Sequence, residues 1–249
     1  RAQSQAYGHS LICLDMPGPV VERLEALPAL LLPVGRCLFY ATREDQIPEF
    51  RDYGEALARW LAEPAPAGAP SPGGAAAFHG TTVSAALALC TERDPHDPAA
   101  RKALFDDLFE ASAWTMLHFD ERWAGRTDLP VSKNTGWLDF THALTFANAV
   151  HRLADRYPDL WPAGLLQMAC FVGRLRPFLD PALETDRWTV EDAGTFLART
   201  RERLFDHGQA EYIISAHFTK VWAAVDEEIR AEPGASWAPM VLAATRRFF

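Results

Sequence analysis

The chain has 249 residues, of which 49% are hydrophobic and 23% charged, so it can form a sizeable core, and an intrinsically disordered chain is excluded. This length suits one large domain or two small ones. The formal net charge is −9, with 33 acidic and 24 basic residues, which leaves no basic cluster and argues against a nucleic-acid partner.

The start of the chain carries no signal peptide, and it opens at Arg1 rather than at a methionine, which is compatible with a fragment of a longer protein. A first apolar run follows His9. The cysteines form neither a C-x-x-C pair nor a zinc-ligand spacing. We therefore expect buried free thiols and a cytoplasmic protein; the four are Cys13, Cys37, Cys90 and Cys170.

Residues 64–74 form a low-complexity stretch in which four prolines stand among alanines and glycines. Such a composition predicts a flexible loop or linker. A separate lobe of about 60 residues before it would bury little surface on its own. We therefore predict one helical domain over residues 1–249, with this stretch as a surface loop.

Helical periodicity dominates the rest of the chain, because apolar residues recur at steps of three and four. The three clearest stripes are Leu104, Leu108, Ala111, Thr115 and His118; Leu138, His142, Thr145, Phe146, Ala149 and Leu153; and Ile213, His217, Val221 and Ala224. Sustained strict alternation is rare. The pattern predicts an all-α fold, a single multi-helix bundle with inward-facing histidines.

Local signals divide this pattern into separate helices. Asp97-Pro98 predicts a helix start, and Glu232-Pro233-Gly234 separates the last two helices. The apolar stretch 161–172 is too short to span a bilayer, so it predicts a core helix, and no membrane partner is expected.

Three of the eight histidines share one sequence context. His79, His142 and His217 are each followed three positions later by a polar residue, and positions i and i+3 share a helix face. A single buried histidine usually just satisfies its hydrogen bonds. The recurrence on three predicted helices instead favours a shared metal site, as bundles build such sites from several helices. Thr82 and Thr145 would then orient the rings.

The other histidines give weaker signals. His118 ends an apolar stripe without a threonine at i+3, which favours a core or interface role and leaves it as a reserve ligand. His151 follows His142 by nine residues, which places it on the opposite helix face at about 100° per residue. His96 is expected in an exposed loop and His207 at a helix end, so neither is assigned a function.

Lys220 lies one turn from His217 on the same apolar stripe. Its stem could pack while the ammonium snorkels into water. Alternatively, a buried ammonium tends to lose its proton, and a neutral amine can add carbon dioxide to form a carbamate. That anion would supply the oxygen ligand that a site built from neutral histidines lacks.

Four segments resemble motifs of the questin oxidase-like proteins. They are Gly8-His9-Ser10-Leu11-Ile12, His142-Ala143-Leu144-Thr145, Ala216-His217-Phe218-Thr219-Lys220-Val221-Trp222-Ala223-Ala224 and Val241-Leu242-Ala243-Ala244-Thr245. They are similar, respectively, to that family's His-Pro-Leu-Ile element, its inner His-x-x-Thr motif, its His-x-x-Lys helix and its last helix. Some relatives join a similar helical region to a Rieske domain, but this chain has no Rieske Cys-x-His pattern.

The resemblance implies a mononuclear non-haem iron, Fe(II), bound by several histidines and a carboxylated lysine. Carried over by motif, His142 and His217 are ligands, Lys220 is the carboxylated residue, and His9 and His79 complete the set. A fragment would leave a further ligand upstream of Arg1. The implied activity is that of an iron-dependent mono- or dioxygenase that acts on an aromatic, polyketide-like small molecule with O2.

Two other functions are compatible with the sequence. One is a non-enzymatic metal-binding or metalloprotein-maturation role, and the other is a metal-free helical adaptor whose histidines only pack. Histidine also binds zinc and manganese, so the residues do not select iron. A homodimer or a redox partner would be compatible with either metal-dependent role.

Overall fold

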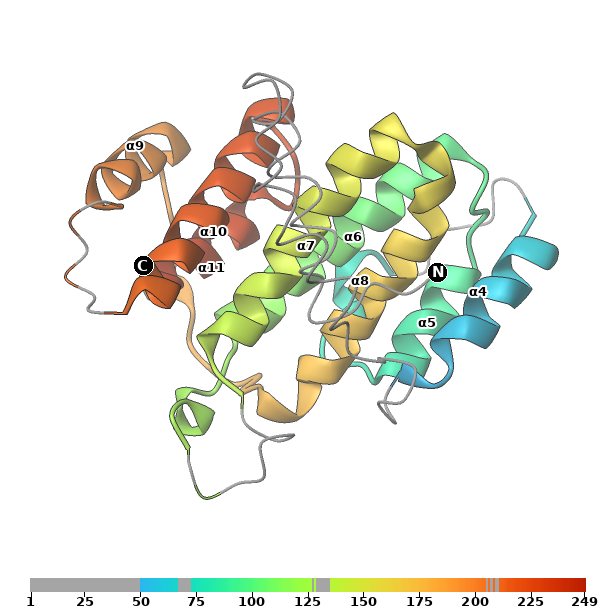
Figure 1. Ribbon diagram of the computed structural model, residues 1–249, viewed down its shortest axis with the longest axis horizontal. Helices are drawn as coiled ribbons and strands as arrows, with labels where there is room; N and C mark the ends of the chain where they lie inside the picture. Colours follow the sequence, from blue (N-terminus) through green and yellow to red (C-terminus); the bar gives the residue numbers. More distant parts are fainter. Residues whose placement is uncertain are drawn as a thin grey trace, which may run out of the picture.

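The computed structural model describes residues 50–66, 73–126, 128, 135–204, 206, 208 and 211–249, and these residues form an all-α fold, as predicted (Figure 1). The helices are α4 (Tyr53–Ala62), α5 (Val83–Thr91), α6 (Pro98–Leu117), α7 (Trp137–Arg156), α8 (Trp161–Leu175), α9 (Ala193–Arg203), α10 (Tyr212–Ala231) and α11 (Ala238–Phe248). Short 3₁₀ turns lie between them: η4 (Ala75–Phe78), η5 (Glu121–Trp123), η7 (Pro158–Leu160), η8 (Arg176–Phe178) and η9 (Asp186–Trp188).

Helix boundaries follow the sequence signals. The Asp97 side chain accepts a hydrogen bond from the Ala99 amide at 2.9 Å, which satisfies one of the free N–H groups at the start of α6. Pro98 occupies the first turn, where its missing N–H costs nothing. The predicted break at 232–234 is also confirmed, because α10 ends at Ala231 and α11 begins at Ala238.

Helix α8 is the central element of the fold. It packs against α4, α5, α6 and α7, and Figure 1 shows it between α5 and α7. Its approach to α5 is so close that a Cβ at Gly173 would lie 2.4 Å from the Val83 amide nitrogen. At Gly164 a Cβ would lie 2.5 Å from a methyl group of Val150 on α7. Glycine is therefore required where α8 meets α5, since backbone atoms cannot move aside as a side chain can.

The remaining helices extend the bundle in two directions (Figure 1). Helices α4 and α5 form one end, and α9, α10 and α11 form the other, with α6 and α7 between them. One hydrophobic core contains residues from α4 through α11. Most of each predicted apolar stripe is buried, but Ile213 is 38% exposed because it lies in the first turn of α10.

Several sequence predictions fall partly or wholly outside these residues. The predicted loop at 64–74 includes residues 67–72, and the single-domain prediction includes residues 1–49; both ranges lie outside the described residues. His9 and His207 do as well. Within the described part of the chain, no helix is both long enough and apolar enough to cross a membrane.

Candidate metal centre

Two of the predicted ligands face each other across the interface between α7 and α10. The Nε2 atoms of His142 and His217 are 3.1 Å apart, and the rings meet edge to face with centroids 4.9 Å apart. Both side chains are buried, with exposed fractions of 5% and 2%. Two residues 75 positions apart in sequence therefore meet at one interior point.

The tautomer of His217 follows from its second ring nitrogen. Its Nδ1 lies 2.7 Å from the carbonyl oxygen of Ile213, one turn earlier in α10. A carbonyl only accepts hydrogen bonds, so Nδ1 carries the proton and donates. The Nε2 atom of His217 consequently presents a lone pair toward His142.

Lys220 supplies the third nitrogen. Its Nζ lies 3.2 Å from the same Nε2 atom of His217, three residues further along α10. Lys220 as a whole is partly buried. The Nε2 atom of His217 is thus the focus at which His142 and Lys220 converge.

The electrostatic environment keeps His217 neutral. Burial lowers the pKa of His217; the bond to the Ile213 carbonyl opposes this effect, and the nearby charge of Lys220 lowers the pKa further. The result is an imidazole that is unprotonated near neutral pH. This is the form that binds metal ions.

The nitrogen spacings fit a shared metal ion. Metal–nitrogen bonds are about 2.0–2.1 Å long, so two ligands at a near-right angle lie about 3 Å apart. The 3.1 Å separation of the two imidazole Nε2 atoms is compatible with that value, and it is equally compatible with an N–H···N hydrogen bond. The described residues contain no group of three His, Cys, Asp or Glu side chains placed to hold a metal ion.

His79 packs against Trp114 of α6 and belongs to a second group of aromatic side chains. The sequence pattern predicted that His79 lies on a helix, and this prediction is wrong. His79 lies in the turn between η4 and α5, and Thr82 caps the start of α5. Its ring stacks on Trp114, with centroids 4.3 Å apart and planes 8° apart. Its buried Nε2 has no hydrogen-bond partner among the described residues. Burial, and then the nearby charge of His118, lower the pKa of His79 to about 4.

His118 shares this second cluster. It stacks on Trp114 from four residues later, with centroids 4.2 Å apart, and its Nδ1 donates to the Trp114 carbonyl at 2.9 Å. Burial is the main cause that lowers the pKa of His118. The packing agrees with the core role favoured by its sequence context. His79 and His118 both stack on Trp114, whereas His142 and His217 contact each other.

The threonines do not orient the rings, which corrects that prediction. The Thr145 hydroxyl donates to the backbone carbonyls of Thr141 and His142, at 3.1 and 3.4 Å. The Thr82 hydroxyl accepts the Ala85 amide and caps α5. Both hydroxyls find local backbone partners, which compete effectively with a ring that lies further away.

Two cysteines lie among the described residues. Cys90 and Cys170 are buried and form no disulfide, as expected. Burial strongly raises the pKa of Cys90, so its thiolate does not form near neutral pH. His96, expected in a loop, is exposed.

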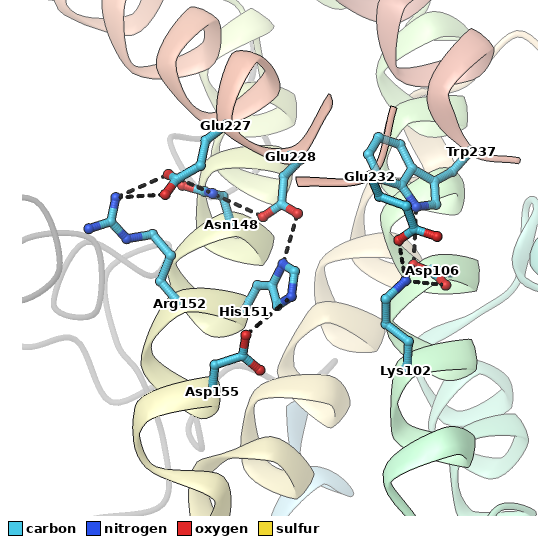
Figure 2. Close-up of polar contacts among 10 residues, drawn as sticks. All are labelled: Lys102, Asp106, Asn148, His151, Arg152, Asp155, Glu227, Glu228, Glu232 and Trp237. Atoms are coloured by element: carbon cyan, nitrogen blue, oxygen red, sulfur yellow. Dashed lines mark hydrogen bonds and ion pairs between the residues drawn. The ribbon is translucent and has the colours of Figure 1, made fainter. Parts of the chain in front are cut away.

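Sequence reasoning missed a buried carboxylate further along the same helix pair (Figure 2). Glu228 is 2% exposed; it accepts a hydrogen bond from the Asn148 amide at 2.9 Å and pairs with Nδ1 of His151 at 2.8 Å. Its position continues the stripe of His217, Val221 and Ala224 by one more step of four. A carboxylate on a buried stripe was the signal available in the sequence.

The charge of Glu228 changes the behaviour of His151. Burial would lower the pKa of His151, but the hydrogen bond and charge of Glu228, with Asp155 adding to them, raise it above its ordinary value. His142 and His151 both contact α10 despite their opposite helical phases. Since 142 meets 217 and 151 meets 228, α7 and α10 run in the same direction.

Comparisons with family models, curated proteins and solved structures gave no match for this chain. Its class is therefore defined by its own geometry: an all-α protein in which two buried imidazoles and a lysine amine converge between two parallel helices.

Proposed function

We propose that His142, His217 and Lys220 hold one metal ion and that the protein is an iron-dependent oxygenase of the questin oxidase-like kind. The supporting observation is the convergence of three nitrogens at separations of 3.1 and 3.2 Å in a buried site. Bound Fe(II) would supply the activation of dioxygen, and an aromatic small molecule would be the substrate. His9 and His79 remain proposed members of the ligand set.

The surrounding residues would prepare this site for a metal. The Ile213 carbonyl fixes the ring of His217 and directs its lone pair into the site. Burial keeps water away from both imidazoles and favours their neutral form. These arrangements hold without a ligand, so binding would require little reorganisation.

Lys220 would contribute as a carbamate. Its neutral amine nitrogen would form a bond to carbon dioxide and release one proton, which leaves an anionic oxygen ligand. The Lys220 amine already lies 3.2 Å from His217 Nε2. The carbamate adds a carboxyl group to this nitrogen, so the lysine would have to adopt another rotamer that moves the nitrogen away from His217. The long side chain of Lys220, a partly buried residue, offers such rotamers.

The first test is metal content. Purified protein reconstituted with Fe(II) without oxygen should retain about one ion per chain, measured by elemental analysis after desalting. His142→Ala and His217→Ala should each weaken binding at least about tenfold, since even outer partners of metal ligands cost that much. The exposed His96→Ala is the matched control and should bind as the unchanged chain does.

Other results would separate the alternatives. Full metal occupancy in both histidine variants would refute the ligand assignment, and absence of metal from the reconstituted chain would favour a metal-free pair joined by an N–H···N hydrogen bond. Lys220→Arg should abolish the site, because guanidinium forms no stable anionic ligand. Oxygen uptake with an aromatic polyketide substrate would distinguish an oxygenase from a structural metal site, whose coordination is saturated by protein.

A further inference from the structure

A groove of about 630 Å³ lies beside α9, away from the proposed ligands. Its apolar side chains are Val190, Phe196 and Phe249, all partly buried. The Phe249 ring also stacks on Phe218 of α10, with centroids 4.8 Å apart. This volume falls within the range of about 300–1,000 Å³ that is typical of small-molecule sites.

Three arginines line the same groove from two different helices. Arg199 and Arg203 lie one turn apart on α9, and Arg246 comes from α11. Arg246 is held in place by donating to the Thr189 carbonyl at 2.5 Å. Arg199 and Arg203 form no ion pair with the described part of the chain. Like charges at i and i+4 disfavour the helix, whereas Arg203 in the last turn of α9 is favoured by the helix dipole.

Two acidic residues, Glu191 and Asp192, line the groove at the start of α9, close in sequence to the Thr189 carbonyl that Arg246 contacts. The Asp192 carboxylate is already engaged, because it accepts the Thr195 amide at 2.5 Å as the cap of α9. Seven residues separate Asp192 from Arg199, which is about 10 Å along a helix. Arg199 and Arg203 lie further along α9 than Asp192, so an anion can approach them away from that carboxylate, although the whole chain carries a net charge of −9.

We propose that this groove, which we call the arginine groove, binds an aromatic carboxylate. The guanidinium groups of Arg199, Arg203 and Arg246 would hold the carboxylate, since their planar forks match it with paired hydrogen bonds. The rings of Phe196 and Phe249 would contact the flat apolar body of the ligand. This inference does not depend on the proposed metal ion.

The test is calorimetric titration of the full chain with 2-naphthoate. Saturable binding at one site per chain is expected. The double variant Arg199→Gln/Arg203→Gln should raise the Kd at least about tenfold, as charge-assisted hydrogen bonds are lost. Arg201→Gln is the matched control, because Arg201 lies on the same helix over the Trp222 ring, 5.8 Å from its centroid, and does not line the groove.

The neutral analogue naphthalene-2-carboxamide isolates the role of the charge and should bind at least about tenfold more weakly. Arg246→Gln provides a second variant on another helix, should the double variant fail to fold, and should also weaken naphthoate. The proposal is overturned if naphthoate does not saturate, if the carboxamide binds equally well, or if Arg201→Gln loses as much affinity as the groove variants.

Discussion

His217 shows how one side chain acquires its chemical role from local backbone geometry. Its position four residues after Ile213 gives Nδ1 a carbonyl partner within its own helix, which leaves Nε2 as the acceptor. The sequence predicted that His217 would be buried and would lie near Lys220, because both follow from helical periodicity. The tautomer required the ring rotamer, which periodicity does not determine.

The pKa of His79 predicts a dependence of stability on pH. The folded pKa of about 4 lies below the unfolded value of about 6.5, so the unfolded chain binds the proton first as pH falls. His79 therefore destabilises the folded chain progressively as pH falls between those two values, and its partial exposure to solvent reduces the size of this effect.

His79→Phe isolates this effect, because it keeps a ring to stack on Trp114 but cannot titrate. The free energy of unfolding, measured by urea titration of chelator-treated protein at pH 7 and pH 4.5, should fall less steeply in the variant. Carboxylates contribute equally to both proteins, so an identical pH dependence would contradict the lowered pKa of His79.

Among the helices, α8 is the element whose packing depends most on a missing side chain. Gly173→Ala should destabilise the protein by at least about 2 kcal/mol, because the added methyl group would lie 2.4–2.5 Å from the Val83 backbone. Gly194→Ala on α9 is the control: the nearest atom lies 3.7 Å away, and alanine favours a helix by up to about 1 kcal/mol. Chemical denaturation measures both, and equal effects would contradict the close α8–α5 contact.

The contact between α7 and α10 predicts a second dependence of stability on pH, with a sign opposite to that of His79. Glu228→Gln should cost about 2 kcal/mol below the ordinary pKa of histidine, near 6.5, where His151 is protonated and paired with Glu228. Because Glu228 raises the pKa of His151 in the folded state, this stabilisation is lost as pH rises through that higher value.

The neighbouring residue provides the control for that variant. Glu227 bonds Arg152 and Asn148 but is 45% exposed, so Glu227→Gln should cost less than about 1 kcal/mol at any pH. Denaturation at pH 6 and pH 9 should therefore show a gap between the two variants that narrows at the higher pH. A constant gap would exclude the His151–Glu228 pair as its cause.

The positions of the helices could be predicted from the sequence, but which helices pack against one another could not. The stripes at 104–118 and 138–153 identified α6 and α7, since periodicity is a local property of the chain. The meeting of α7 with α10 spans 75 residues and depends on how α8 and α9 connect them. His79 illustrates the remaining error: its i+3 threonine suggested a helix, but Gly80, with φ of 64°, follows it in a turn.

Across the whole molecule, polar contacts fasten helices that are distant in sequence (Figure 2). Lys102 on α6 pairs with Asp106 on the same helix and with Glu232 just after α10, at 2.7 and 2.6 Å. The Trp237 indole donates to the same Asp106 at 3.0 Å. The turn between α10 and α11 is thereby tied to α6, which places the proposed metal site and the arginine groove on one connected framework.

Arg247 joins the last helix to α6 in a way that affects synthesis of the protein. Its guanidinium, 5% exposed, donates to the carbonyls of Leu117 and Phe119, 130 and 128 residues earlier. During translation α6 leaves the ribosome long before α11. The Leu117 and Phe119 carbonyls therefore lack the Arg247 donor until α11 has been synthesised. The end of α6 can therefore reach its final form only after α11 has emerged, which makes completion of this fold a late event in the life of the nascent chain.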